Sequence, residues 1–163
     1  MEIKKRLNLR SVLAVVYFVC FGIFLNIGLR PAEATNYEIS AELAIPAIGL
    51  TSDVATLELK DHQLDTPDYI VGSFTREKNK TLLIGHSTTV FSDLDEIKLG
   101  DEIFYDETNY KITNIEVLEK SDVDMDKILA TEDVKTLVLM TCAGELLNNG
   151  DATHRLIITA VVE

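Results

Sequence analysis

The 163-residue sequence contains no Trp, only three Pro and only two Cys, and its Asp and Glu outnumber its Lys and Arg by 27 to 15. Two Cys are too few for a disulfide-rich miniprotein. A formal net charge of −12 argues against a nucleic-acid binder, because such proteins gain affinity by neutralising phosphates with cations. With 47% hydrophobic residues the chain is not intrinsically disordered, and its length suits one domain of ordinary size.

The few cations are concentrated at the N-terminus. Four of them lie within residues 1–10, whereas residues 11–29 contain no charged side chain. As a helix at about 1.5 Å per residue, this uncharged run is about as long as the hydrocarbon core of a bilayer is thick. Residues 11–29 are therefore predicted to form a transmembrane signal anchor.

The basic residues also predict an orientation for this anchor. Because one cation, Arg30, follows closely where four precede it, the positive-inside rule puts residues 1–10 in the cytoplasm. The length of the apolar run favours an uncleaved anchor over a signal peptide, although Ala32–Ala34 matches a signal-peptidase site. We expect a single-pass protein of the cell membrane, with a juxtamembrane linker over 30–42 and an extracytoplasmic domain over 43–163.

Short apolar runs separated by turn residues characterise this domain, and no long amphipathic helix is visible. A hairpin turn is expected at 107–109, and short helices at 94–99 and 123–130. Strands are expected at 43–50, 54–59, 69–74, 81–84, 101–105, 110–118, 135–141 and 156–162. This spacing of strands and turns predicts an all-β barrel or sandwich.

Cys142 is the first candidate for chemistry in this domain. Membrane topology separates it from Cys20 in the apolar run, so the two are not expected to form a disulfide. Cys142 ends the run KTLVLMTC, where a strand would hold the backbone while the thiol is accessible, as a nucleophile requires. The sequence equally allows Cys142 to be a small buried core residue.

A thiol nucleophile needs a basic or cationic neighbour, because the thiol is mostly protonated at neutral pH. His86 ends one predicted strand and His154 begins another, and their spacing does not choose between them. Arg155 offers fixed positive charge for an oxyanion, but adjacent strand residues face opposite sides, so His154 and Arg155 cannot serve one site together. A hydrogen-bonded loop residue and a surface ion-pair partner are the alternative interpretations of His86 and Arg155.

Five segments, in order along the chain, resemble the sortase family of membrane-anchored cysteine transpeptidases. They are LAIPAIGL at the family's first strand, LLIGHS at its catalytic His, VFSDLDEIKLGDEI at the following helix and turn, VLMTC at its T-L-x-T-C signature, and RLIITA at its essential Arg. The resemblance covers residues 43–163, and Val138 stands where the signature has its first Thr.

The resemblance implies a fold and a set of site residues. The fold is a sortase-type β-barrel of about eight strands with short helices, following one N-terminal transmembrane helix. Cys142 is implied as the nucleophile, His86 as the general acid and base, and Arg155 as the group that stabilises the substrate carbonyl or oxyanion. His154 becomes an outward-facing neighbour, and Thr141 is expected to help shape the substrate site.

The resemblance also implies the reaction and its partners. The enzyme would cut an LPxTG-like C-terminal sorting signal of a secreted protein through a thioacyl-enzyme, and then transfer the acyl group to an amine of a peptidoglycan precursor or a pilin. Leu146 and Leu147, in the loop Ala143–Thr153, are candidates for substrate contact or for ordinary packing. Two rival functions are a thiol protease with water as acceptor and a non-catalytic, membrane-tethered β-domain.

No cofactor and no metal site are predicted. Asp122, Asp124 and Asp126 have the spacing that begins an EF-hand loop, but Lys127 and Asp133 stand where that loop requires Gly and Glu. Some sortases bind calcium through acidic loops, which is compatible with this acidic domain, but a solvated acidic surface is the interpretation that the sequence favours.

Overall fold

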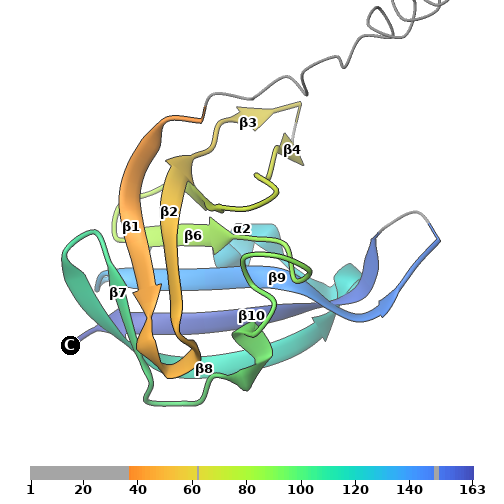
Figure 1. Cartoon of the computed structure of the whole chain (residues 1–163). Coiled ribbons are helices and arrows are strands. Elements are labelled where there is room, and N and C mark those ends of the chain that lie inside the picture. The colour runs from red at the N-terminus through yellow and green to blue at the C-terminus, as the bar shows by residue number, and fades with distance from the viewer. Residues whose placement is uncertain (1–36, 62, 149–150) are drawn as a thin grey trace, which may run out of the picture. The chain divides into compact units, whose positions relative to one another are not determined.

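The computed structural model describes residues 37–61, 63–148 and 151–163, which form strands joined by loops and a few helical turns (Figure 1). The strands are β1 (Ile39–Ile45), β2 (Leu50–Thr56), β3 (Leu59–Lys60), β4 (Gln63–Leu64), β5 (Val71–Phe74), β6 (Lys80–Ile84), β7 (Glu102–Tyr105), β8 (Thr108–Glu119), β9 (Thr136–Leu146) and β10 (Ala152–Val162). The helical turns are η1 (Pro46–Ile48), η2 (Leu94–Glu96), η3 (Lys120–Asp122) and α2 (Met125–Ile128).

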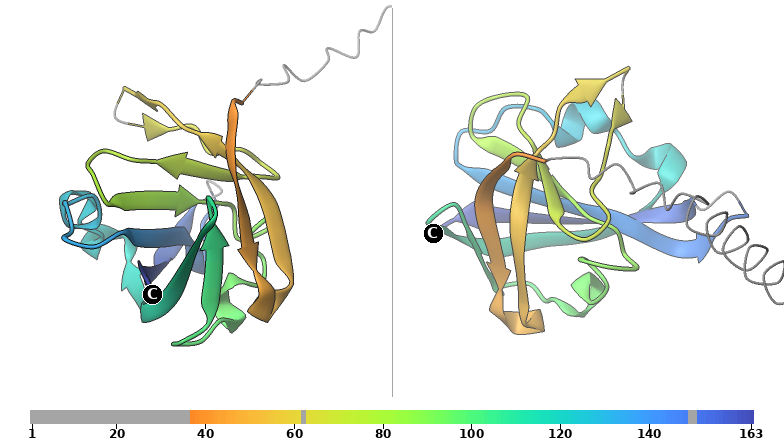
Figure 2. Two further views of the ribbon diagram at one scale, coloured as in Figure 1. Left: turned by 90° about the vertical axis from the view of Figure 1, so that its left-hand side faces the viewer. Right: turned by 45° about the horizontal axis from the view of Figure 1, so that its top comes forward.

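Eight of the strands close into a barrel in the order β1-β2-β5-β6-β9-β10-β8-β7, and β7 pairs with β1 to complete it. The remaining two strands, β3 and β4, form a separate hairpin that projects beyond the barrel in all three views (Figures 1 and 2). The prediction of an all-β barrel of about eight strands is confirmed, and the alternative of a sandwich is excluded.

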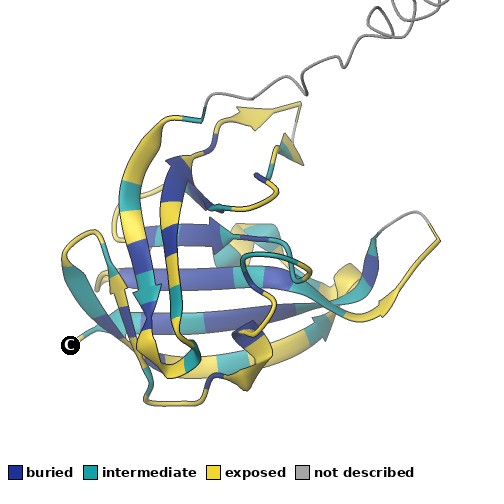
Figure 3. Cartoon of the chain, viewed as in Figure 1, coloured by how far each residue is buried: buried dark blue, intermediate teal, exposed yellow. Residues whose placement is uncertain are grey.

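Alternation of side chains along the strands creates two apolar clusters. Buried residues extend along much of β6, β9 and β10 (Figure 3). Leu83, Leu139 and Ile158 are fully buried in the barrel interior, together with residues from every other strand of the barrel. Their sequence neighbours, among them Leu82 and Val138, form a second cluster on the opposite, outer face of β6, β9 and β10. Side chains from α2 and from the residues that flank it, Val123 and Leu129, pack on this outer cluster and cover part of that face.

Two strand pairs are parallel, β2 with β5 and β6 with β9, and the remaining pairs of the barrel are antiparallel. The β6–β9 pairing matches Ile84 with Met140. Since both strands run in the same direction, the residues that follow Ile84 are placed beside those that follow Met140. This pairing matters because the two predicted site residues His86 and Cys142 lie two positions further along.

The first predicted strand, 43–50, is wrong in its bounds. Pro46 has no backbone N–H to give to a ladder, and it begins η1 in place of continuing the strand. Gly49, at φ +64°, then ends the turn, and the chain reverses into β2. β1 accordingly begins at Ile39, within the segment that was expected to be linker.

The predicted turns and helices also differ from the structure in detail. The β7–β8 hairpin turns at Asp106 and Glu107, both with positive φ, so β8 already begins at Thr108 and the predicted turn at 107–109 is displaced. The expected helix at 94–99 is the single turn η2. The one at 123–130 is the short α2, whose N-terminus is capped by the side chain of Asp124.

The predicted transmembrane segment at 11–29 lies outside the described residues. Within the part of the chain that the structure describes, no helix has both the length and the apolar character needed to cross a bilayer.

Candidate active site

Cys142 and Arg155 face each other across neighbouring strands. They are cross-strand partners in the antiparallel β9–β10 pair, where opposed Cα atoms lie about 4.5–5.5 Å apart. Met140, two residues before Cys142, and Ile157, two residues after Arg155, both belong to the outer cluster. By strand alternation the side chains of Cys142 and Arg155 therefore emerge on that same outer face.

His86 is brought to this face by the end of β6. The N–H of Gly85 donates to the carbonyl of Met140 at 3.5 Å, and the hydroxyl of Thr141 donates to the carbonyl of Gly85 at 2.7 Å. These bonds keep the chain beside β9 up to His86. Ile84, two residues earlier, packs on the outer cluster, so His86 continues the outward-facing series toward Cys142.

The turn after His86 explains why a glycine precedes it. The carbonyl of His86 accepts hydrogen bonds from the N–H of Thr89 and of Phe91, which folds the chain back over Gly85. A Cβ on Gly85 would lie 2.6 Å from a side-chain carbon of Val90 and 2.7 Å from one of Phe91. The backbone at Gly85 is thus held by β9 on one side and by this turn on the other.

The imidazole of His86 is partly exposed, and its Nε2 lies 3.9 Å from Oδ1 of Asp68. The side chain of Asp68 is 82% exposed, so this contact is a weak, solvated one. It nevertheless gives the His86 ring an acidic neighbour from a distant loop.

Cys142 is a free thiol of intermediate burial, and it is therefore not the fully buried core residue that the sequence also allowed. β9 continues four residues past it, to Leu146, because Ala143 pairs with His154 and Leu146 pairs with Ala152. The prediction that Cys142 ends its strand is wrong. The strand holds its backbone on both sides, and the thiol is of intermediate burial.

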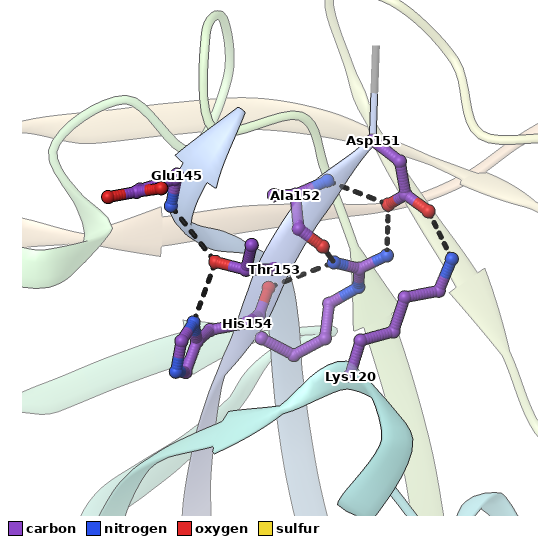
Figure 4. Close-up of polar contacts among 7 residues, drawn as sticks. Lys120, Glu145, Asp151, Ala152, Thr153 and His154 are labelled. Atoms are coloured by element: carbon purple, nitrogen blue, oxygen red, sulfur yellow. Dashed lines mark hydrogen bonds and ion pairs between the residues drawn. The ribbon is translucent and has the colours of Figure 1, made fainter. Parts of the chain in front are cut away.

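The guanidinium of Arg155 is held by the first residues of β10 and by the residue before them (Figure 4). Its Nη1 donates to the carbonyls of Ala152, at 3.1 Å, and His154, at 2.8 Å. Its Nη2 donates to Oδ1 of Asp151 at 2.7 Å, in an ion pair whose side chains are 15% and 23% exposed. Arg155 is therefore a restrained side chain and not a mobile surface cation.

Asp151 also pairs with a second cation. Its Oδ2 accepts from the ammonium of Lys120 in η3, and Oδ1 further accepts from the N–H of Ala152. The hydrogen bonds from Lys120, then from Arg155 and from the Ala152 backbone, hold the pKa of the Asp151 carboxyl well below its usual range. Figure 4 shows Lys120 and Asp151 on one side of the start of β10, with Glu145 and His154 on the other.

His154 is held within the β9–β10 hairpin and is partly exposed. Its Nδ1 lies 2.8 Å from the hydroxyl of Thr153, which also accepts from the N–H of Glu145. A Cβ at Gly144 would lie 2.5 Å from that hydroxyl and 2.6 Å from Nδ1 of His154. His154 thus packs across the hairpin, on the strand side opposite Arg155.

The other predicted site residues differ in exposure. Thr141 is 4% exposed, and its hydroxyl is bonded to Gly85. This bond joins β9 to the residue after β6, directly before His86. Leu146 and Leu147, in contrast, are 66% and 47% exposed, so they are not ordinary packing residues of the domain.

An apolar pocket of about 500 Å³ adjoins this site. Ile84 and Met140, each two residues before a predicted catalytic residue, form part of its wall, and Met125 and Leu129 contribute from α2 and its C-terminus. The other lining residues are Leu59, Leu64, Thr66, Phe74 and Arg76. A largely apolar lining with a few polar groups is typical of ligand pockets.

Within residues 37–61, 63–148 and 151–163, no group of three or more His, Cys, Asp or Glu side chains is arranged to hold a metal ion. The acidic residues near α2 serve other contacts: Asp124 caps the helix, and Asp126 pairs with Arg76 at 2.8 Å.

Sequence reasoning missed Gly85, Asp68, Lys120 and Asp151. Of these four residues, only Gly85 could have been identified from the sequence, because a glycine in or beside a strand often marks a close approach of another backbone segment. The contacts of Asp68 with His86, and of Lys120 and Asp151 with each other, join separate loops, and no spacing along the chain predicts them.

A thiol, an imidazole and a restrained guanidinium on one face of a closed barrel define a cysteine-enzyme type of site. The model of the sortase domain matches residues 43–163, and the chain belongs to the sortase family. This family consists of cysteine transpeptidases, and the chain is accordingly an enzyme of sortase type. Among curated proteins, no sequence matches the chain.

Solved structures of other sortases have the same fold. Sortase A from Corynebacterium diphtheriae superposes with a TM-score of 0.61 at 19% identity, over 94% of this chain and 83% of its own. Sortase C-1 from Actinomyces oris superposes with a TM-score of 0.60 at 23% identity, over 77% of this chain and 72% of its own. The sortase D5 transpeptidase of Clostridium perfringens superposes with a TM-score of 0.59 at 27% identity, over 77% of this chain and 79% of its own.

Proposed function

We propose that this chain is a membrane-anchored transpeptidase that cuts an LPxTG-like C-terminal sorting signal and transfers the cut protein to an amine. The observation that carries the proposal is the convergence of Cys142, His86 and Arg155 on one outer face of β6, β9 and β10. A thiol, a titratable imidazole and a fixed cation are the groups that acyl transfer through a thioester needs.

Each of the three residues has one role in the proposed reaction. The thiolate of Cys142 attacks the carbonyl carbon of a Thr–Gly-type bond, and Arg155 stabilises the negative charge that develops on the carbonyl oxygen. His86 protonates the departing amine as the C–N bond breaks, which leaves a thioacyl-enzyme. The acceptor amine then attacks the thioester, gives its proton to His86, and releases Cys142 as the leaving group.

Two apolar surfaces would bind the sorting signal. The apolar pocket beside Ile84 and Met140 suits the Leu and Pro side chains that precede the cut bond. Leu146 and Leu147, exposed on the β9–β10 hairpin, would contact the substrate from the other side of Cys142.

We infer the location and partners of the enzyme from the same reaction. The anchor at 11–29 would leave residues 1–10 in the cytoplasm and place the catalytic domain outside, beside secreted proteins that carry sorting signals. Attachment of enzyme and substrate to one membrane raises their effective concentration. The acceptor would be an amine of a peptidoglycan precursor or a pilin, and the reaction as written needs no cofactor.

Intact-mass spectrometry of the full chain in detergent micelles, mixed with a panel of sorting peptides, tests the proposal. We expect a mass increase equal to the acyl fragment, located on Cys142 and absent in Cys142→Ala. Adding an amine acceptor should remove the adduct and yield the peptide–amine product. Hydrolysis alone, with and without the amine, would instead show a thiol protease. A native Cys142 that resists thiol reagents and forms no adduct would show a non-catalytic domain.

A further inference from the structure

The guanidinium of Arg155 is fixed in one orientation by its hydrogen bonds. Two carbonyls of its own strand hold Nη1, and the carboxylate of Asp151 holds Nη2. A long Arg side chain has several freely rotating bonds, and a carbonyl acceptor alone is a weak restraint on them. The charge-assisted bond to Asp151 is the strongest of the three, because both of its partners are ionised and largely shielded from solvent.

These bonds leave part of the guanidinium available to a ligand. A guanidinium has five N–H donors, and the three bonds occupy both donors of Nη1 and one of Nη2. In the described part of the chain, the N–H of Nε and the second N–H of Nη2 have no hydrogen-bond partner. Nε and Nη2 lie along one edge of the planar group, so this edge retains donor capacity for an acceptor oxygen.

Lys120 prevents Asp151 from cancelling the charge of Arg155. The two cations share one carboxylate, with Lys120 on Oδ2 and Arg155 on Oδ1. The cluster of three residues therefore retains one net positive charge next to Cys142. An Asp paired with Arg155 alone would orient the guanidinium but would also neutralise it, which would weaken the stabilisation of an oxyanion.

We propose that Asp151 is the positioning residue of Arg155: it fixes the guanidinium with one edge free for the substrate oxygen, while Lys120 balances the carboxylate. The proposal rests on the proposed function for the identity of that oxygen. It does not make Asp151 a catalytic residue, because Asp151 acts only through Arg155 and need not touch the substrate.

Steady-state kinetics of the full chain in micelles provide the first test. Asp151→Ala should lower kcat for transpeptidation about 10- to 100-fold, because a misplaced catalytic group is costly, with KM changed by less than about threefold. Asp151→Asn keeps an acceptor at Oδ1 and should lose less. In the Arg155→Ala background, Asp151→Ala should have no further effect beyond about twofold, since its partner is already absent.

The matched control is Glu163→Gln. Like Asp151, Glu163 is a carboxylate paired with a Lys, and its Oε1 lies 2.8 Å from Nζ of Lys111. Glu163 directly follows β10, at the opposite end of that strand from Arg155. This variant should retain wild-type kcat. Independent, additive losses from Asp151→Ala and Arg155→Ala would overturn the proposal, and so would a rise in kcat on Asp151→Ala, which would instead make Asp151 an inhibitory latch.

A second measurement does not depend on the reaction. In protein labelled with ¹⁵N-arginine, slow rotation of the Arg155 guanidinium should give separate NMR signals for its N–H groups. Asp151→Ala should merge them, whereas Glu163→Gln should not. Unchanged signals in Asp151→Ala would overturn the positioning role even if the enzyme is active. If Asp151→Ala merges the signals but the wild-type protein transfers no acyl group, the positioning role is supported and the proposed function is rejected.

Discussion

Arg155 on β10 is the direct cross-strand partner of Cys142 on β9, and both side chains emerge on the outer face of the barrel. The backbone ladder between the two strands fixes the separation of the two Cα atoms. The separation of these two backbone positions is therefore a property of the sheet. The orientation of the guanidinium, in contrast, depends on the side chains around it.

Thr141→Val should destabilise the domain and slow the reaction. The change keeps the shape of the side chain but removes its hydrogen bond of 2.7 Å to the carbonyl of Gly85. This buried carbonyl then loses the Thr141 hydroxyl as its donor. The loss is expected to be about 1–3 kcal/mol in free energy of unfolding, measured by urea denaturation. Because His86 follows Gly85, kcat should also fall, by about 10-fold.

Thr113→Val is the control for this variant. Thr113 donates to the carbonyl of Thr159 at 3.3 Å, but its side chain is exposed on β8, so the change should cost less than about 0.5 kcal/mol. Equal losses of stability in the two variants would contradict the role assigned to Thr141.

Gly144→Ala should be more damaging than Gly49→Ala. Both glycines have positive φ, +76° and +64°, so an L side chain is strained at either position by about 1–2 kcal/mol. Only at Gly144 would the new Cβ also clash, with Thr153 and His154, whereas nothing lies within 4 Å of it at Gly49. We expect Gly144→Ala to cost at least about 1 kcal/mol more, measured by urea denaturation.

The Gly144 variant should also lose activity, because the hairpin that it distorts carries Cys142 on one strand and Arg155 on the other. Retention of full activity together with wild-type stability would show that the hairpin tolerates the clash.

Met125→Asp should weaken substrate binding. Met125 lines the apolar pocket, and a carboxylate there would have to be desolvated when an apolar side chain of the sorting signal enters. We expect KM for the sorting peptide to rise at least about 10-fold, with a smaller change in kcat. Met125→Leu, which conserves volume and polarity, should keep KM within about threefold. The alkylation rate of Cys142 should stay the same in both variants, and a KM unaffected by the carboxylate would place the peptide elsewhere.

The stability of the domain should depend on Asp151 at neutral pH and not in acid. Its pKa is held below the usual range by the hydrogen bond from Lys120 and then by that from Arg155, so the ionised form is favoured in the folded state. A carboxyl whose pKa is lower in the folded state contributes stability above its unfolded pKa of about 3.9 and loses that contribution as pH falls further.

Thermal denaturation of the wild type and of Asp151→Asn between pH 2 and pH 7 checks this dependence. The wild type should be the more stable at pH 7, and the difference should shrink steadily below about pH 4. A difference in Tm that is constant across this range would mean that the carboxylate charge does not contribute.

Local sequence was sufficient for the chemistry and for the type of fold. The apolar run that leads to Cys142 and the short apolar runs bounded by turn residues predict the strands, because these signals depend on neighbouring residues. The ordered motifs then identify the family. The same local reasoning failed where a neighbouring strand decides the outcome. β9 extends past Cys142 only because residues 152–154 are there to pair with it.

The sequence by itself thus determined that this is an acidic β-domain of the sortase family with Cys142, His86 and Arg155 as its candidate catalytic residues. Only the tertiary structure decided how they meet. The parallel pairing of β6 with β9 brings His86 beside Cys142 across 56 residues of chain, a separation that no periodicity encodes. It also decided that Asp151 and Lys120, from loops that close on each other in space, set the orientation and the charge around Arg155. Such contacts arise from the closure of the barrel, since a closed sheet places loops from distant strands at one end.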